Sequence, residues 1–161
     1  MAEDAPTIED YYREDRTFPP SPEFVAGANV ADAAIYQRAA ADAPAFWAEQ
    51  ARELLDWDTD FDTALEWELP DARWFVGGRL NVSYNCVDRH VEAGRGDRVA
   101  FHWEGEPGDT RTITYADLLA EVQRCANALR GLGVEQGDRV VIYMPMIPET
   151  VVAMLACTRI G

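Results

Sequence analysis

Apolar positions in the first third of the chain recur at helical spacing. Ser21 followed by Pro22 is typical of a helix start, with a capping hydroxyl and a proline in the first turn. Asn29 predicts the cap of a second helix that continues to residue 41. Pro44 opens a third helix over residues 44–57, whose apolar side chains lie three or four residues apart: Phe46, Trp47, Ala51, Leu54 and Leu55.

Residues 56–80 show no clear period, although they are rich in large rings. Five of their aromatic side chains alternate with acidic residues: Trp57, Phe61, Trp67, Trp74 and Phe75. Leaving one such side chain in water forfeits roughly 1.5–3 kcal/mol of burial free energy. We therefore predict an irregular segment whose rings pack either on another surface or on the chain's own helices, and the sequence favours neither.

The spacing of apolar residues changes from a helical to a strand period after a helix that follows residue 81. Asn81 predicts the cap of a helix over residues 82–93, which Gly94 or Gly96 ends. Residues 98–105 then alternate as a strand does, with Val99, Phe101 and Trp103 on one face. Residues 106–110 predict a turn, and residues 111–115 predict the second strand of a hairpin.

The last third predicts the beginning of an α/β sheet. Thr114 and Asp117 form a capping-box pattern before a helix over residues 115–133, which ends at Gly131 and Gly133. Residues 140–143 are continuously apolar, which indicates a strand buried on both faces. Pro148 opens a final helix, and a helix after a buried strand returns to a parallel neighbour. The fold class is therefore α/β, with a helical leader, a hairpin and the start of a sheet.

Charge narrows the possible partners. The chain has 14 basic and 29 acidic residues, a net charge of −15, and no lysine. Adaptation to a high-salt cytoplasm explains the acidity better than a GC-rich genome, which explains only arginine in place of lysine. Nucleic acid is not expected as a partner, because its phosphates would be repelled. The acidic start and the lack of a long apolar run predict a cytoplasmic protein without a membrane partner.

Cys86 and His90 are the most suggestive chemical pair. They lie four residues apart, as a thiolate and its base could on one helix face. Cys86 nevertheless belongs to the apolar stripe of its helix, so a buried structural role is the favoured interpretation. The three cysteines (Cys86, Cys125 and Cys157) form no C-x-x-C pair, which argues against a disulfide framework or a zinc site. We expect His102 to be partly exposed.

Two further groups are better explained without a ligand. The alternating acids Asp56, Asp58, Asp60 and Asp62 are reminiscent of a calcium loop, but Phe61 and Trp67 occupy the places of its glycine and its last glutamate. A solvated acidic face is therefore expected. Gly77 and Gly78 are expected to permit a tight turn before the Asn81 cap.

Four stretches together resemble a known family: FWAEQARELLDW, WFVGGRLNVSYNCVDRH, ITYADL and GDRVVIYMPMIPETVVAMLACTRIG. They are similar to the N-terminal part of AMP-forming acetyl-CoA synthetases, in the adenylate-forming ligase superfamily. The resemblance implies three regions: a flexible start at residues 1–20, a helical N-terminal region at 21–93, and the incomplete beginning of the AMP-binding domain at 94–161.

The resemblance also implies a reaction: acetate and ATP give acetyl-adenylate, and CoA then gives acetyl-CoA and AMP, with magnesium accompanying ATP. That chemistry needs a phosphate loop rich in glycine and serine or threonine, and lysines, none of which occurs here. We therefore assign no catalytic, cofactor-binding or metal-binding residue and expect these residues alone to be inactive. The remainder of the adenylation domain is the implied partner.

Alternatives stay open at this point. Propionyl- and acetoacetyl-CoA synthetases share a similar leader, so the acyl group is less secure than the reaction. A free-standing acidic protein that interacts through residues 56–80 is the alternative from another class. Four arginines could attract the phosphates of CoA, but in so acidic a chain they are expected to pair with nearby carboxylates: Arg73, Arg79, Arg89 and Arg95.

Overall fold

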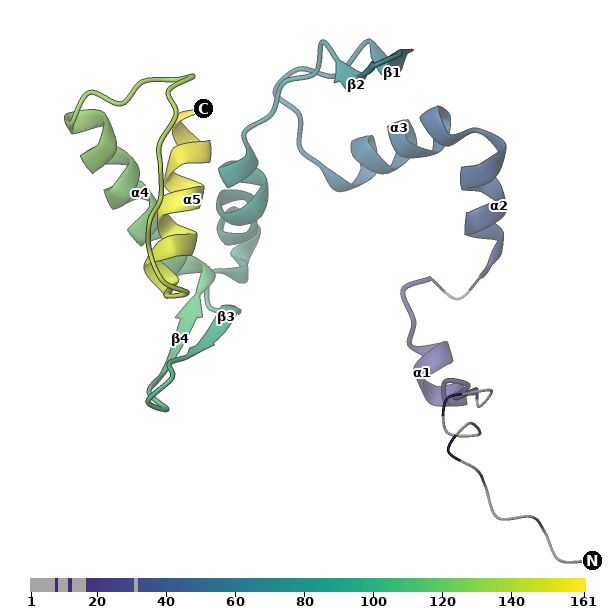
Figure 1. Ribbon diagram of the computed structural model, residues 1–161, viewed down its shortest axis with the longest axis horizontal. Helices are drawn as coiled ribbons and strands as arrows, with labels where there is room; N and C mark the ends of the chain where they lie inside the picture. Colours follow the sequence, from purple (N-terminus) through teal and green to yellow (C-terminus); the bar gives the residue numbers. More distant parts are fainter. Residues whose placement is uncertain (1–7, 9–11, 13–16, 31) are drawn as a thin grey trace, which may run out of the picture. The chain divides into compact units, whose positions relative to one another are not determined.

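A computed structural model describes residues 8, 12, 17–30 and 32–161 (Figure 1). The chain divides into two compact units, Met1–Ala43 and Pro44–Gly161. The predicted flexible start at residues 1–20 lies largely outside the described residues. Within the described part of the chain, no helix is both long enough and apolar enough to cross a membrane.

The first unit contains two short helices, α1 (Pro22–Ala26) and α2 (Ala34–Ala41). The Ser21 side chain accepts a hydrogen bond from the Phe24 backbone N–H at 3.2 Å, which confirms the predicted cap. The predicted start of the second helix at Asn29 is wrong. The Asp32 carboxylate accepts the Ala34 N–H at 2.9 Å and satisfies a donor of the first turn there, so α2 begins later.

Helix α3 (Ala43–Leu54) confirms the third predicted helix, with Ala51 buried. Its last turn ends against two side chains from later in the chain. The Trp57 indole N–H donates to the carbonyl of Ala51 at 2.9 Å, and Arg89 donates to the carbonyl of Leu54 at 2.9 Å. The Arg89 bond satisfies a carbonyl of the last helical turn, and the Trp57 bond adds a second donor to the Ala51 carbonyl, which also accepts the Leu55 N–H at 3.2 Å.

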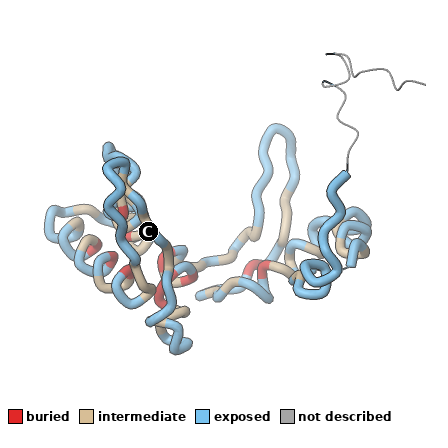
Figure 2. The backbone as a smooth tube through the Cα atoms, turned by 90° about the horizontal axis from the view of Figure 1, so that it is seen from below, coloured by how far each residue is buried: buried red, intermediate tan, exposed pale blue. Residues whose placement is uncertain are grey.

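The prediction of an irregular segment over residues 56–80 is wrong, because much of it forms an antiparallel hairpin of β1 (Thr63–Glu68) and β2 (Asp71–Val76). At its base, the rings of Trp57, Phe61 and Phe75 lie 5.0–5.7 Å apart between centroids, so these rings pack on one another. Its turn end is exposed in Figure 2. In β1, Leu65 and Trp67 alternate with Glu66 and Glu68, which is the period of two that indicates a strand and that the prediction missed.

The glycine pair after β2 allows the close turn that was predicted. Gly77 has φ +87°, in the left-handed region that side chains disfavour. A Cβ on Gly78 would come within 2.6 Å of the Trp57 ring. Both glycines are therefore needed where the chain returns past the aromatic rings toward Asn81.

A helix follows over residues 82–95, and Asn81 caps it by accepting the Tyr84 N–H at 3.0 Å. It contains a π-helical turn, η2 (Tyr84–Asp88), and a second stretch, η3 (Val91–Arg95), which is interrupted at Gly94 by a φ of +74°, where the helix was predicted to end. The Arg89 N–H reaches back five residues to the Tyr84 carbonyl, and the wider turn changes which side chains face inward. Val87 and Asp88 are buried, whereas Cys86 is exposed, so its predicted place in the buried stripe is wrong.

The second predicted hairpin is confirmed as β3 (Val99–Glu104) and β4 (Thr110–Thr114). An irregularity in the register between Val99 and Phe101 separates their faces, so Val99 does not join Phe101 and Trp103 as predicted and is 43% exposed. His102 is exposed and bonds Thr112 across the strands at 3.1 Å.

Helix α4 (Tyr115–Gly131) begins at the predicted capping box. Thr114 Oγ1 accepts the Asp117 N–H at 3.2 Å, and the Asp117 carboxylate accepts the Thr114 N–H at 3.3 Å. The Thr114 hydroxyl also donates to Asp117, and these hydrogen bonds lower the pKa of the Asp117 carboxyl.

The predicted buried strand at residues 140–143 is wrong, because the segment pairs with no strand in the described part of the chain. Val141 is 91% exposed and Tyr143 is fully exposed. A strand needs a neighbour to satisfy its backbone, and its local sequence cannot supply one. The segment is instead held at its far end, where the Trp103 indole donates to the Met146 carbonyl at 2.8 Å.

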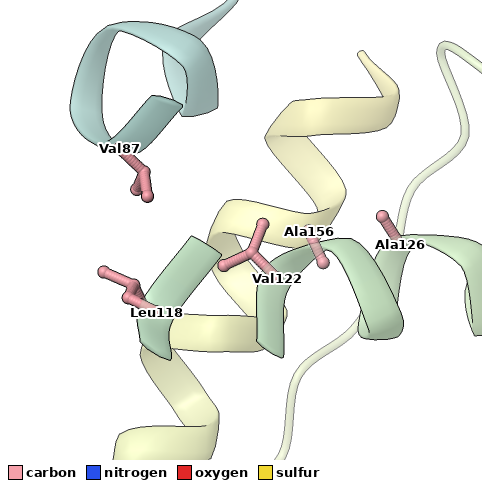
Figure 3. Packing of buried hydrophobic residues seen from close by; sticks show 5 residues of the cluster. All are labelled: Val87, Leu118, Val122, Ala126 and Ala156. Carbon is pink, nitrogen blue, oxygen red and sulfur yellow. The ribbon is translucent and has the colours of Figure 1, made fainter. Parts of the chain in front are cut away.

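Helix α5 (Pro148–Ile160) starts where predicted and packs against α4. Figure 3 shows the core between helix 82–95, α4 and α5. Its buried apolar members are Val87, Leu118, Val122, Ala126 and Ala156. Helix α4 supplies three of the five residues, Leu118, Val122 and Ala126, which are spaced four apart on one helix face.

Candidate functional site

A partly buried ion pair joins helix 82–95 to α5. One guanidinium nitrogen of Arg159, Nη1, donates to both carboxylate oxygens of Asp88 at 2.8 and 2.7 Å. The Asp88 side chain is 10% exposed and the Arg159 side chain 28%. Asn81 binds the same helix end, because its side-chain amide donates to the Arg159 carbonyl at 3.1 Å. The pair thus fixes the helix cap and the end of α5 together.

Asn85 extends this polar cluster to the segment after α3. Its side-chain oxygen accepts the Asp56 backbone N–H at 2.9 Å, and its amide donates to the Asp56 carbonyl at 2.9 Å. Arg89 donates to the Asn85 carbonyl at 2.7 Å and contacts the Asp56 carboxylate at 3.3 Å. Asn85 is buried and its polar atoms are paired, as a buried amide requires.

Sequence reasoning missed the roles of Asn85, Asp88 and Arg159. The available signal was a pair of polar residues, Asn85 and Asp88, three apart on a helix that also carries the apolar Val87. Their partners lie 29 and 71 residues away, so the sequence alone does not give the pairing. The hydrogen bonds of this cluster join helix 82–95 to α5 and to the segment after α3, so the cluster is a structural clamp.

Cys86 and His90 are not arranged as a nucleophile and base. His90 Nδ1 instead accepts a hydrogen bond from Arg95 at 2.7 Å, and its ring lies 5.2 Å from the Tyr115 ring. Burial, followed by the charges of Arg89 and Arg95, lowers the pKa of the His90 imidazole. The neutral ring is the form that accepts from a guanidinium, so geometry and pKa agree.

The acidic residues of the 56–62 segment bind arginines and backbone. Asp60 pairs with Arg52 at 2.9 Å, and Asp56 takes part in the clamp around Asn85. Among the described residues, no group of three or more histidine, cysteine or acidic side chains is placed to hold a metal ion. Asp56, Asp58, Asp60 and Asp62 are all exposed, which confirms the predicted solvated acidic face.

The four arginines divide into two groups. Arg73 pairs with Glu66 across the β1–β2 hairpin and Arg89 pairs with Asp56, which confirms the prediction of carboxylate partners for these two. The prediction is wrong for Arg95, whose partner is the His90 ring. Arg79 makes no ion pair within the described residues, and its backbone bridges Thr59.

A hollow of about 630 Å³ lies beside the base of the β1–β2 hairpin. Trp57, Trp74 and Phe75 line it together with Arg79 and the end of α5. A smaller one of about 270 Å³ is lined by Asp58, Asn81 and Tyr84 beside the Asp88–Arg159 pair. The lining of these two hollows combines rings with paired polar groups and contains no pairing of a nucleophile with a base.

Comparison with known proteins identifies the family of this chain. Residues 33–86 match the family described as the acetyl-coenzyme A synthetase N-terminus, and residues 87–161 match the family of AMP-binding enzymes. The chain is 61% identical over 149 residues to an acetyl-coenzyme A synthetase of Gemmatimonas aurantiaca. It belongs to the acetyl-CoA synthetase family. Membership of this family of AMP-forming ligases accounts for the similarity of the four sequence stretches to acetyl-CoA synthetases.

The similarity covers most of this chain and a minor part of each relative. The Gemmatimonas alignment covers 92% of this chain and 23% of that protein. An acetyl-coenzyme A synthetase of Mycobacterium bovis is 58% identical over all of this chain, which is 24% of its length. The solved structure of acetoacetyl-CoA synthetase from Streptomyces lividans matches 88% of this chain with a TM-score of 0.76, at 28% identity and over 25% of that chain.

Proposed function

We propose that this chain is part of an acetate–CoA ligase that forms acetyl-adenylate from acetate and ATP, and then acetyl-CoA and AMP. Its identity of 61% to an acetyl-coenzyme A synthetase over 92% of its length carries this conclusion. The identity to a solved acetoacetyl-CoA synthetase is 28%, which favours acetate over the longer acyl groups. ATP and CoA follow from the family, and magnesium would accompany ATP.

We also propose that residues 1–161 do not catalyse adenylation alone. Transfer at the α-phosphorus of ATP concentrates negative charge, which positioned cations and a phosphate-binding loop stabilise. The sequence has no lysine and no glycine-rich phosphate loop. The polar cluster around Asp88 and Arg159 is occupied by contacts within the chain, and it has a structural part in this proposal.

A chimera tests both statements. Residues 1–161 replace the aligned segment of the Gemmatimonas acetyl-coenzyme A synthetase, and acetate-dependent exchange of pyrophosphate into ATP is measured. We expect exchange with acetate by the chimera and none by residues 1–161 alone. A folded chimera without exchange would refute the ligase assignment, and exchange by the 161 residues would refute their inactivity.

The acidity of the chain supports a proposal about its solvent. With a net charge of −15 and no lysine, the folded chain repels itself at low ionic strength. We propose that it works in a salt-rich cytoplasm, where this repulsion is screened. Unfolding in urea at increasing KCl should show stability that continues to rise at molar salt. A stability that levels off below about 0.2 M, where screening of surface charge is already largely complete, would argue against it.

A further inference from the structure

The β1–β2 hairpin has one aromatic face. Directly opposite residues of an antiparallel pair lie on the same face, and so do residues two apart in one strand. The register places Leu65 opposite Trp74 and Trp67 opposite Ala72. These four side chains therefore share one side of the hairpin, and we call it the tryptophan face (Leu65, Trp67, Ala72 and Trp74).

The other face of the hairpin is charged toward its turn. Glu66 lies opposite Arg73 and forms an ion pair with it, and Glu68 lies opposite Asp71. Like charges directly opposite each other are tolerated where water hydrates both. This face therefore suits solvent, and the hairpin has the amphipathic pattern of a ribbon with one buried side.

The tryptophan face is nevertheless open in the described chain. Trp67 is 64% exposed, Trp74 43%, and Leu69 at the turn 78%. A buried tryptophan removes about 150–250 Å² from water, so two of them leave a substantial apolar patch. The ring cluster at the base fixes only one end of the hairpin, and a lone two-stranded ribbon is marginally stable in water.

We propose that the tryptophan face docks onto the part of the acetyl-CoA synthetase polypeptide that the relatives possess beyond the length matched here. The matched regions are only 23–25% of each relative, so about three quarters of each protein lies outside the comparison. The hairpin lies in the segment that matches the acetyl-coenzyme A synthetase N-terminus.

This inference rests on the proposed function, because it names the partner of the same chain within a whole ligase. The occupant must present an apolar surface to the two indoles, while the face that carries Glu66, Glu68 and Asp71 stays in water. Docking would hold the outer part of the hairpin, which the ring cluster at its base does not reach.

Hydroxyl-radical footprinting with mass spectrometry reads each tryptophan separately. We expect oxidation of Trp67 and Trp74 to fall at least fivefold in the Gemmatimonas chimera relative to residues 1–161. Unchanged oxidation in a chimera that exchanges pyrophosphate would overturn the docking and leave the proposed function intact. Protection of residues 1–161 that rises with protein concentration would assign the face to a second copy and also overturn it.

A pair of neighbouring substitutions provides the matched control, because Trp67 and Glu68 point to opposite faces. In the chimera, Trp67→Ala should increase cleavage by a protease within residues 63–76 at least fivefold, and Glu68→Ala should change it less than twofold. Equal effects of the two substitutions would contradict docking through the tryptophan face. The cleavage assay does not depend on exchange activity, so an inactive chimera that shows this difference would refute only the ligase assignment.

Discussion

The Asp88→Asn substitution tests whether the ion pair between helix 82–95 and α5 stabilises the fold. The asparagine keeps the size of the side chain but loses its charge, and its amide N–H₂ faces the guanidinium. Arg159 Nη1 now donates to both oxygens of Asp88 at 2.7–2.8 Å, whereas an asparagine oxygen can accept only one of these bonds.

The magnitude follows from burial and from the charge of the bond. A hydrogen bond to a charged group contributes about 1.5–3 kcal/mol, and the Asp88 side chain is 10% exposed. Arg159 keeps 28% of its side chain in solvent, so water compensates part of the loss. We expect the free energy of unfolding to fall by about 2 kcal/mol, which corresponds to roughly 4–8 °C in melting temperature.

Urea unfolding followed by circular dichroism measures this loss. Glu121→Gln is the matched control, because Glu121 pairs with Arg124 on an exposed surface and should cost no more than about 0.5 kcal/mol. A double-mutant cycle with Arg159→Met should give a coupling energy of about 1–2 kcal/mol. Equal losses for Asp88→Asn and Glu121→Gln, or a coupling near zero, would refute the stabilising role of the pair.

Three further predictions concern single positions. Thr114→Ala should reduce the free energy of unfolding, measured in urea, by about 1 kcal/mol, because it removes the capping hydroxyl of α4. An equal loss for the control Thr110→Ala, at the start of β4, would contradict this. The lowered pKa of His90 means that the folded state binds its proton less well, so the contribution of His90 to stability is present above about pH 6.5 and is lost as the pH falls below that value. His90→Gln should therefore flatten the dependence of the unfolding free energy on pH between 7 and 5 relative to His102→Gln, and equal slopes would exclude this role. Cys86 is exposed while the other two cysteines are partly buried, so a thiol reagent should modify one site fast, and a fast phase that persists in Cys86→Ser would show that another thiol is accessible.

The sequence predicted the elements whose causes are local. Helix α4 has a cap at Thr114, a stripe of apolar residues three or four apart, and glycine at its end, and these signals lie within about 20 residues. The β3–β4 hairpin has alternation and a turn in one short stretch. The interpretation of Cys86 as a buried structural residue was wrong, because Cys86 is exposed.

The elements that were missed depend on partners distant in sequence or on unusual backbone. Residues 140–143 have the composition of a strand, but a strand exists only when another segment accepts its hydrogen bonds. Asn85 and Arg159 gain their roles from residues 29 and 71 positions away. The β1–β2 hairpin is an exception, because the alternation of Leu65 and Trp67 with Glu66 and Glu68 is a local strand signal that the interpretation of an irregular segment missed.

The π-helical turn Tyr84–Asp88 gives helix 82–95 a phase that an ordinary α-helix would not have. This turn takes in one more residue than an α-turn, so later side chains are rotated around the axis relative to earlier ones. Deleting one residue within Tyr84–Asp88 would tend to restore α geometry and would turn the rest of the helix by about 100°. Asp88 and His90 could not then both meet their present partners, so insertions and deletions here should be far less tolerated than substitutions at exposed positions such as Cys86.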